Sequence, residues 1–224
     1  FGIPRSGEVL RAVTLTTYDD IPFEKGFGTI ISERVADLFI LIAIVLVAIF
    51  MQTDDLLAYL HQQNINPLYT FLIFFGLVGI IILGLNLVRR STWKPFAKIR
   101  KLAKGLLEGM RSILKMEKKW AFLGHTVFIW TMYVWMFYVI KFCLPETASV
   151  AAGSIMAAFV VGSFAVSATN GGIGVYPLSV AGILIFFGVP DHAAEAFGWI
   201  SWATQTFVVL VFGGLSFILL PVLN

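Results

Sequence analysis

The stretch "SATNGGIGVYPLSV", residues 167–180, lies near the middle of an uncharged run that extends from Thr147 to Pro190. The whole run contains no Asp, Glu, Lys, Arg or His, and its length suffices for two membrane crossings of about 20 residues each. Its centre nevertheless holds three glycines, an asparagine and a proline, which are residues that interrupt helices. The sequence therefore predicts a helix that is broken inside an apolar segment.

The composition of the chain is that of an integral membrane protein. Of its 224 residues, 58% are hydrophobic and 13% are charged, whereas a soluble domain has roughly 45–50% apolar and about 25% charged residues. Cys143 is the only cysteine, which excludes an internal disulfide and a cysteine-based zinc cage. No metal-binding, phosphate-loop or nucleophile motif occurs, so we expect no metal and no cofactor. We expect an all-α, polytopic membrane helix bundle with broken or re-entrant helices, forming one transmembrane domain over residues 1–224.

Uncharged segments define the expected spans. The first uncharged segment becomes long enough to span the membrane only if its helix begins near Pro22, with Asp20 as a candidate N-cap. A half-helix at 178–188 reaches only about 16 Å, which is half of a bilayer. The full spans are expected at 35–53, 67–88, 120–143, 148–168 and 196–220.

The positive charges predict the orientation. Eleven of the 16 Lys and Arg residues fall between Arg89 and Lys119, and cytoplasmic loops are enriched in these residues. Residues 89–119 are therefore expected on the cytoplasmic side of the cell (cytoplasmic or inner) membrane. Apolar residues recur in this segment every three or four positions, which predicts an amphipathic helix on the anionic leaflet and not a coiled coil or a nucleic-acid patch. Residues 1–34 fall on the same side, while 54–67, 145–147 and 191–192 fall outside.

The glycine-rich turn is the first candidate site. Gly171, Gly172 and Gly174 can adopt positive φ and present successive amide N–H groups as a nest for an anion. The half-helix behind them points its positive end at the same place, and Asn170 and Tyr176 complete the candidate substrate-binding set. Broken helices of this kind form substrate sites in secondary transporters. The alternative is a plain tight turn at the cytoplasmic face.

The N-terminal stretch "FGIPRSGEVLRAVTL", residues 1–15, is the second candidate site. Arg5, Glu8 and Arg11 recur every three residues after a break in the chain. Glu8 can pair with either arginine, and the other guanidinium can bind a phosphate through two hydrogen bonds. This stretch weakly resembles the glycine-rich turn, as expected if two helix breaks of an inverted repeat meet. The alternative role for both arginines is anchoring to lipid headgroups.

A third cluster lies in "ISERVADLF", residues 31–39, at the mouth of the first long span. Charged side chains inside a span usually face the bundle and pair. Glu33, Arg34 and Asp37 are therefore expected to form an ion pair that fixes helices, with Arg5 or Arg11 as the partner. A proton or substrate relay is the alternative.

Three motifs in a fixed order, "PRSGEVLRA" (4–12), "ERVADL" (33–38) and "NGGIGVYP" (170–177), resemble the lysylphosphatidylglycerol synthase transmembrane-region family, also described as flippase-like membrane proteins. The resemblance covers essentially the whole chain. The family normally has further spans before the first motif, so we expect an N-terminally incomplete sequence. The resemblance implies translocation of a phospholipid-like or polyprenyl-linked lipid. Family positions match at Pro4, Arg5, Gly7, Glu8, Arg11, Glu33, Arg34, Asp37, Gly171, Gly172 and Gly174.

Two positions depart from the family pattern. Asn170 stands where the family often has proline, and Pro177 stands where it often has glutamate. A mechanism that needs this carboxylate is therefore not expected here. The aminoacyl-transferase domain that accompanies some relatives is absent from the sequence, so we do not expect lysyl transfer by this chain itself.

The sequence thus predicts a lipid flippase or translocase in which Arg5, Arg11 and the glycine-rich turn hold the phosphate of an anionic lipid. The expected partners are membrane lipids and no nucleic acid, with a lipid-modifying synthase or a second copy of the chain as further candidates. Two alternatives stay open. One is a membrane-embedded glycosyl or aminoacyl transferase or its accessory subunit, and the other is a structural membrane protein.

Overall fold

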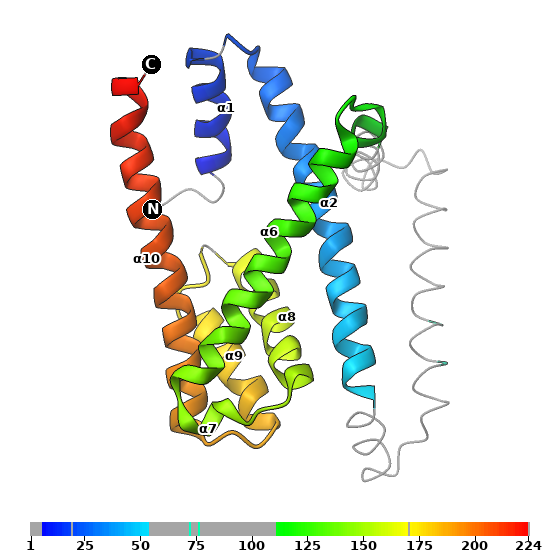
Figure 1. The fold of residues 1–224 in the computed structure, drawn as a ribbon, viewed down its shortest axis with the longest axis vertical. Helices are drawn as coiled ribbons and strands as arrows, with labels where there is room; N and C mark the ends of the chain where they lie inside the picture. Colours follow the sequence, from blue (N-terminus) through cyan, green and yellow to red (C-terminus); the bar gives the residue numbers. More distant parts are fainter. Residues whose placement is uncertain are drawn as a thin grey trace, which may run out of the picture.

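The computed structural model describes residues 6–18, 20–53, 111–169 and 171–223, together with Leu72 and Gly76. Within these ranges the chain is helical apart from short turns, so the prediction of an all-α membrane bundle is confirmed (Figure 1). The elements are α1 (Ser6–Tyr18), α2 (Phe23–Met51), α6 (Lys119–Ile140), the short 3-10 helix η2 (Lys141–Cys143), α7 (Pro145–Ala148), α8 (Ala152–Ala168), α9 (Val175–Phe186) and α10 (Asp191–Leu223).

Among the described residues, three helices have the length and composition needed to cross a membrane. Their apolar segments are Gly26–Met51 in α2, Lys119–Cys143 in α6 and η2, and Asp191–Ser216 in α10. The chain is therefore a multi-pass membrane protein. The span expected at 67–88 and most of the basic segment 89–119 lie outside the described residues.

The helix α2 begins directly behind Pro22, as the length of the first span required. The prediction of Asp20 as its N-cap was wrong, because Pro22 occupies the cap position and no side chain caps the helix. Asp20 instead has a φ of 51° in the turn between α1 and α2, a left-handed conformation that Asp tolerates better than most residues. The turn folds α1 back on α2, where the fully buried Ala12 lies against Gly26.

The helices α8 and α9 form a hairpin that is too short to cross a bilayer. They have 17 and 12 residues, which correspond to about 25 and 18 Å of helix, against about 30 Å of hydrocarbon core. Both outer ends lie at the end of the bundle that contains α7, and the turn lies about midway along α10 (Figure 1). The hairpin therefore enters and leaves the bundle at the same end (Figure 1), whereas a full span was expected at 148–168. The short helix begins at Val175, earlier than the expected residue 178.

The main core lies where the hairpin meets α6 and α10. Leu184 and Val180 of α9 are fully buried there. The Phe137 ring of α6 packs edge-on against Phe159 of α8 at 5.6 Å and against Phe197 of α10 at 5.1 Å. Edge-to-face aromatic pairs at such distances add to the free energy gained by burying apolar surface. The hairpin is thus held by apolar packing against α6 and α10.

One glycine allows α9 and α10 to approach at backbone distance. A Cβ atom added at Gly198 would lie 2.4 Å from the carbonyl oxygen of Pro177, which is closer than any side chain permits. This contact fixes how closely the first turn of α9 packs against α10.

A second, smaller cluster joins the described end of the basic segment to α2. Residues 111–115 are helical, and Ile113 is buried against Val35 and Ala36, with Phe122 and Leu123 of α6 beside them. This apolar face agrees with the amphipathic pattern of the segment. The rest of that predicted helix lies outside the described residues.

Candidate functional site

The turn between α8 and α9 depends on three glycines. Gly171, Gly172 and Gly174 have φ values of 74°, 72° and 74°, and Gly174 combines this with a ψ of −45° as the N-cap of α9. An L side chain is strained in this region of backbone space, whereas glycine is not. Asn170 lies outside the described residues.

Within the described residues, the backbone amides of this turn have no acceptor. The Tyr176 amide donates to the Gly172 carbonyl at 2.8 Å, and the Leu178 amide donates to the Gly174 carbonyl at 3.2 Å. No group in the part of the chain that the structure describes accepts from the successive amides of residues 171–175. Gly171 and Ile173 are exposed. Consecutive free N–H groups in such a turn form a concave, positively polarised site for an anion.

Two aromatic residues hold the turn in place. The indole Nε1–H of Trp202 in α10 donates a hydrogen bond of 2.9 Å to the carbonyl oxygen of Gly171. Tyr176 is 6% exposed and lies against Gly162 and Gly172, where an added Cβ would be 2.8 Å from its ring and 2.9 Å from its Cβ atom, respectively. Tyr176, a predicted binding residue, thus packs behind the turn. Trp202 escaped the sequence analysis because no spacing rule relates it to Gly171.

The first and second motifs are joined by a two-pronged ion pair. The Nη1 and Nη2 atoms of Arg11 donate to the two carboxylate oxygens of Glu33 at 2.7 and 2.8 Å, which connects α1 to α2. Arg11 and Glu33 side chains are 56% and 33% exposed, so the pair is open to its surroundings on one side. Arg5 and the side chain of Glu8 lie outside the described part of the chain.

One helical turn further along α2, Asp37 connects α2 to α6. Its Oδ1 atom accepts a hydrogen bond of 2.9 Å from the indole of Trp130, and its Oδ2 atom lies 3.5 Å from Arg34 Nη1. Charged side chains in a span are expected to pair in this way. The sequence does not reveal which aromatic ring of α6 faces Asp37, so this partner was not predicted.

The structure therefore connects the first motif to the second, and leaves the third separate. Across residues 6–18, 20–53, 111–169 and 171–223, no hydrogen bond or ion pair joins Arg11 to the glycine-rich turn. Figure 1 shows α1 and this turn in the region between α2 and α10, with the turn nearer to α7. The role of these residues in binding stays a prediction.

Two of the histidines lie on α6 and α10. His125 is exposed on α6, and Nε2 of His192 lies 3.7 Å from Glu146 Oε1, which connects α10 to α7. Among the described residues, no three of His, Cys, Asp and Glu gather closely enough to hold a metal ion.

Comparison with known proteins gives one match. Residues 3–213 match the family described as lysylphosphatidylglycerol synthase TM region, a range that includes all three motifs and ends within α10. No curated protein and no solved structure matches the chain.

Proposed function

The chain belongs to the lysylphosphatidylglycerol synthase transmembrane-region family, and we propose that it moves a phosphate-bearing lipid headgroup across the cytoplasmic membrane. Family membership establishes a membrane protein of a lipid-related family. The translocation, the choice of an anionic lipid and the cytoplasmic location of residues 89–119 are parts of the proposal.

The observation that supports the proposal best is the row of amides at residues 171–175, for which the described chain provides no acceptor. An unpaired polar group buried in an apolar environment costs about 1–3 kcal/mol, and irregular backbone at membrane depth persists only where protein or water satisfies it. A re-entrant turn with free amides therefore needs a polar cavity beside it. The oxygens of a lipid phosphate are suitable acceptors for these groups.

No carboxylate in the first turn of α9 neutralises the partial positive charge at the N-terminus of this helix. Its first turn contains no acidic residue, because Pro177 occupies the position where the family often has glutamate. The partial positive charge at a helix N-terminus favours an anion by about 0.3–1 kcal/mol near a surface. This modest attraction suits a ligand that has to leave the site again.

Arg11 can contribute to the same task without leaving Glu33. The pair occupies two of the five N–H donors of the guanidinium, so three remain for a second acceptor. The Arg11 side chain is 56% exposed, and Glu33 keeps its guanidinium in one orientation. In the proposed mechanism the headgroup passes between α1 and the turn while the tails stay in the bilayer.

Vesicles that contain the purified protein and a fluorescent phosphatidylglycerol test the proposal. Wild type should transfer the labelled headgroup between leaflets, and Arg11→Ala should abolish the transfer. Arg111→Ala is the matched control, because Arg111 is an exposed arginine of the basic segment. Unchanged transfer in Arg11→Ala would remove this residue from the site. A new lipid product that forms from an activated glycosyl or aminoacyl donor, without transfer, would replace the proposal by the transferase alternative.

A further inference from the structure

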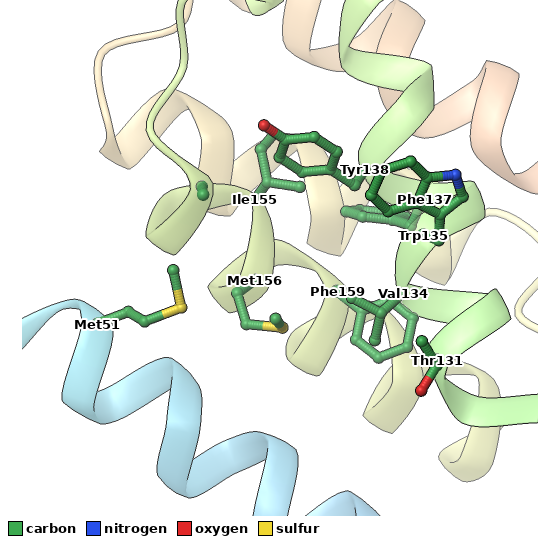
Figure 2. A pocket seen from close by; sticks show the side chains of 10 residues that line it. Met51, Thr131, Val134, Trp135, Phe137, Tyr138, Ile155, Met156 and Phe159 are labelled. Carbon is green, nitrogen blue, oxygen red and sulfur yellow. The ribbon is translucent and has the colours of Figure 1, made fainter. Parts of the chain in front are cut away.

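An apolar groove lies between the ends of α2, α6 and α8 (Figure 2). It encloses about 230 Å³ and is lined by Met51 of α2, by residues of α6 that include Trp135, and by residues of α8 that include Met156. The hydroxyl of Thr131, which also lines the groove, donates to the Val127 carbonyl of its own helix at 2.8 Å. The lining therefore presents almost only hydrocarbon.

A groove of this kind is filled by hydrocarbon and not by water. A smaller apolar cavity, of about 150 Å³, stays dry and binds benzene. The groove opens to the surroundings, because Met51 and Trp135 are 44% and 61% exposed. Both residues belong to helices long enough to span a membrane, where the abundant hydrocarbon is a lipid tail. Flexible methionines on two of the three walls can adapt to such a chain.

A buried cation lies at one end of the groove. Lys141 is only 7% exposed, and its Nζ atom donates to the Val150 carbonyl at 2.9 Å. The same atom lies 4.8 Å from the centroid of the Tyr138 ring, which lines the groove. Tyr138 is drawn among the lining residues in Figure 2, so Lys141 lies beside a wall of the groove.

The charge of Lys141 lacks an anionic partner in the described chain. No carboxylate among the described residues lies within ion-pair distance of its ammonium group. An ammonium has three N–H donors, of which the Val150 carbonyl takes one. Buried charges are normally paired, so we expect an anion beside Lys141. Because the neighbouring groove is apolar, an anion with a hydrocarbon tail would fit this place best.

We propose that the groove and Lys141 together bind one anionic phospholipid, with an acyl chain in the groove and the phosphate at Lys141. The short helix η2, which begins at Lys141, packs beside α7, at the end of the bundle opposite the described end of the basic segment (Figure 1). The lipid therefore belongs to the leaflet that faces away from residues 111–119. This site does not depend on translocation, because it binds lipid whether or not the chain moves one.

Photo-crosslinking of the full chain in nanodiscs tests this site. The probe is phosphatidylglycerol with a diazirine in one acyl chain, and the expected crosslinks lie in residues 131–138 and 152–159. Lys141→Gln should lower the crosslinking yield about fivefold, the effect of one basic residue on anionic-lipid binding, whereas Lys141→Arg should retain most of it. Lys119→Gln, at the other end of α6, is the matched control and should leave the yield unchanged.

A second variant distinguishes a loss of lipid binding from misfolding of the protein. Ala152→Leu narrows the groove without altering Lys141, and should lower the tail crosslinks in a protein whose helix content is unchanged. Equal yields in wild type, Lys141→Gln and Ala152→Leu would overturn the proposal, as would wild-type crosslinks that all lie outside the groove. The readout is binding at equilibrium, so it is separate from the headgroup transfer measured for the proposed function.

Discussion

Both terminal nitrogens of the Arg11 guanidinium bind the two carboxylate oxygens of Glu33, at 2.7 and 2.8 Å. This pair joins the first motif to the second. Because α1 also packs on α2 through Ala12 and Gly26, the ion pair fixes the rotation of α1 about its own axis. The ion pair therefore determines in which direction the remaining N–H groups of the Arg11 guanidinium point.

Glu33→Gln should lower the free energy of unfolding by about 0.5–1 kcal/mol. The value is small because both side chains are at least a third exposed and exposed ion pairs are screened. Thermal unfolding of the detergent-solubilised protein measures it. The exchanged pair Arg11→Glu with Glu33→Arg should recover stability relative to either single variant. A double variant no more stable than the singles would contradict a direct interaction.

Gly174→Ala should destabilise the protein by about 1–2 kcal/mol through backbone strain alone. An added Cβ meets no atom within 4 Å at this position, so the cost comes from the φ of 74°. Gly182→Ala is the control, because Gly182 lies in regular helix with equally open space and should gain about 0.5–1 kcal/mol. Effects of the same sign and size in chemical unfolding would argue against the left-handed turn.

Gly198→Ala should be the most damaging glycine substitution in α10. Its Cβ would lie 2.4 Å from the Pro177 carbonyl oxygen, so α9 and α10 must separate, at a cost of about 1–3 kcal/mol or more. Gly213→Ala, which meets nothing within 4 Å, should have little effect. Comparison of the two melting temperatures checks this, and similar values would show that the two helices do not pack as described.

Trp202→Phe should loosen the glycine-rich turn while it keeps the apolar contacts of the ring. The lost hydrogen bond to Gly171 is worth about 0.5–1.5 kcal/mol. Hydrogen exchange followed by mass spectrometry should show faster exchange at the amides of Tyr176 and Leu178, which donate to Gly172 and Gly174. Trp199→Phe is the control, because its ring packs against Trp202 but makes no hydrogen bond within the described chain. Equal exchange in both variants would remove Trp202 from this role.

The local features of the fold followed from the sequence. Three glycines inside an uncharged run predicted the break, and the short apolar segment behind them predicted a helix that cannot span. These features depend on residues that are neighbours in the chain. The start of α2 at Phe23 followed from the minimum length of a span. The N-cap was predicted wrongly, since Asp20 lies in a left-handed turn that the sequence alone does not reveal.

The contacts between helices did not follow from the sequence. Trp130 with Asp37, Trp202 with Gly171, and Gly198 with Pro177 each join distant segments, and each depends on how one helix is rotated against another. In a chain that is mostly apolar, hydrophobic periodicity contains little information on that rotation. For the same reason the sequence did not show which of a few acidic residues pairs with Arg11.

The most direct test of the re-entrant turn is the depth of a spin label at residue 173. Ile173 is 60% exposed, so Ile173→Cys in a Cys143→Ser background gives one labelling site beside the free amides. In reconstituted vesicles the label should lie between the two headgroup regions and still be reached by a water-soluble paramagnetic reagent. A label at the depth of the headgroups, or one that only oxygen reaches, would contradict a polar turn inside the membrane.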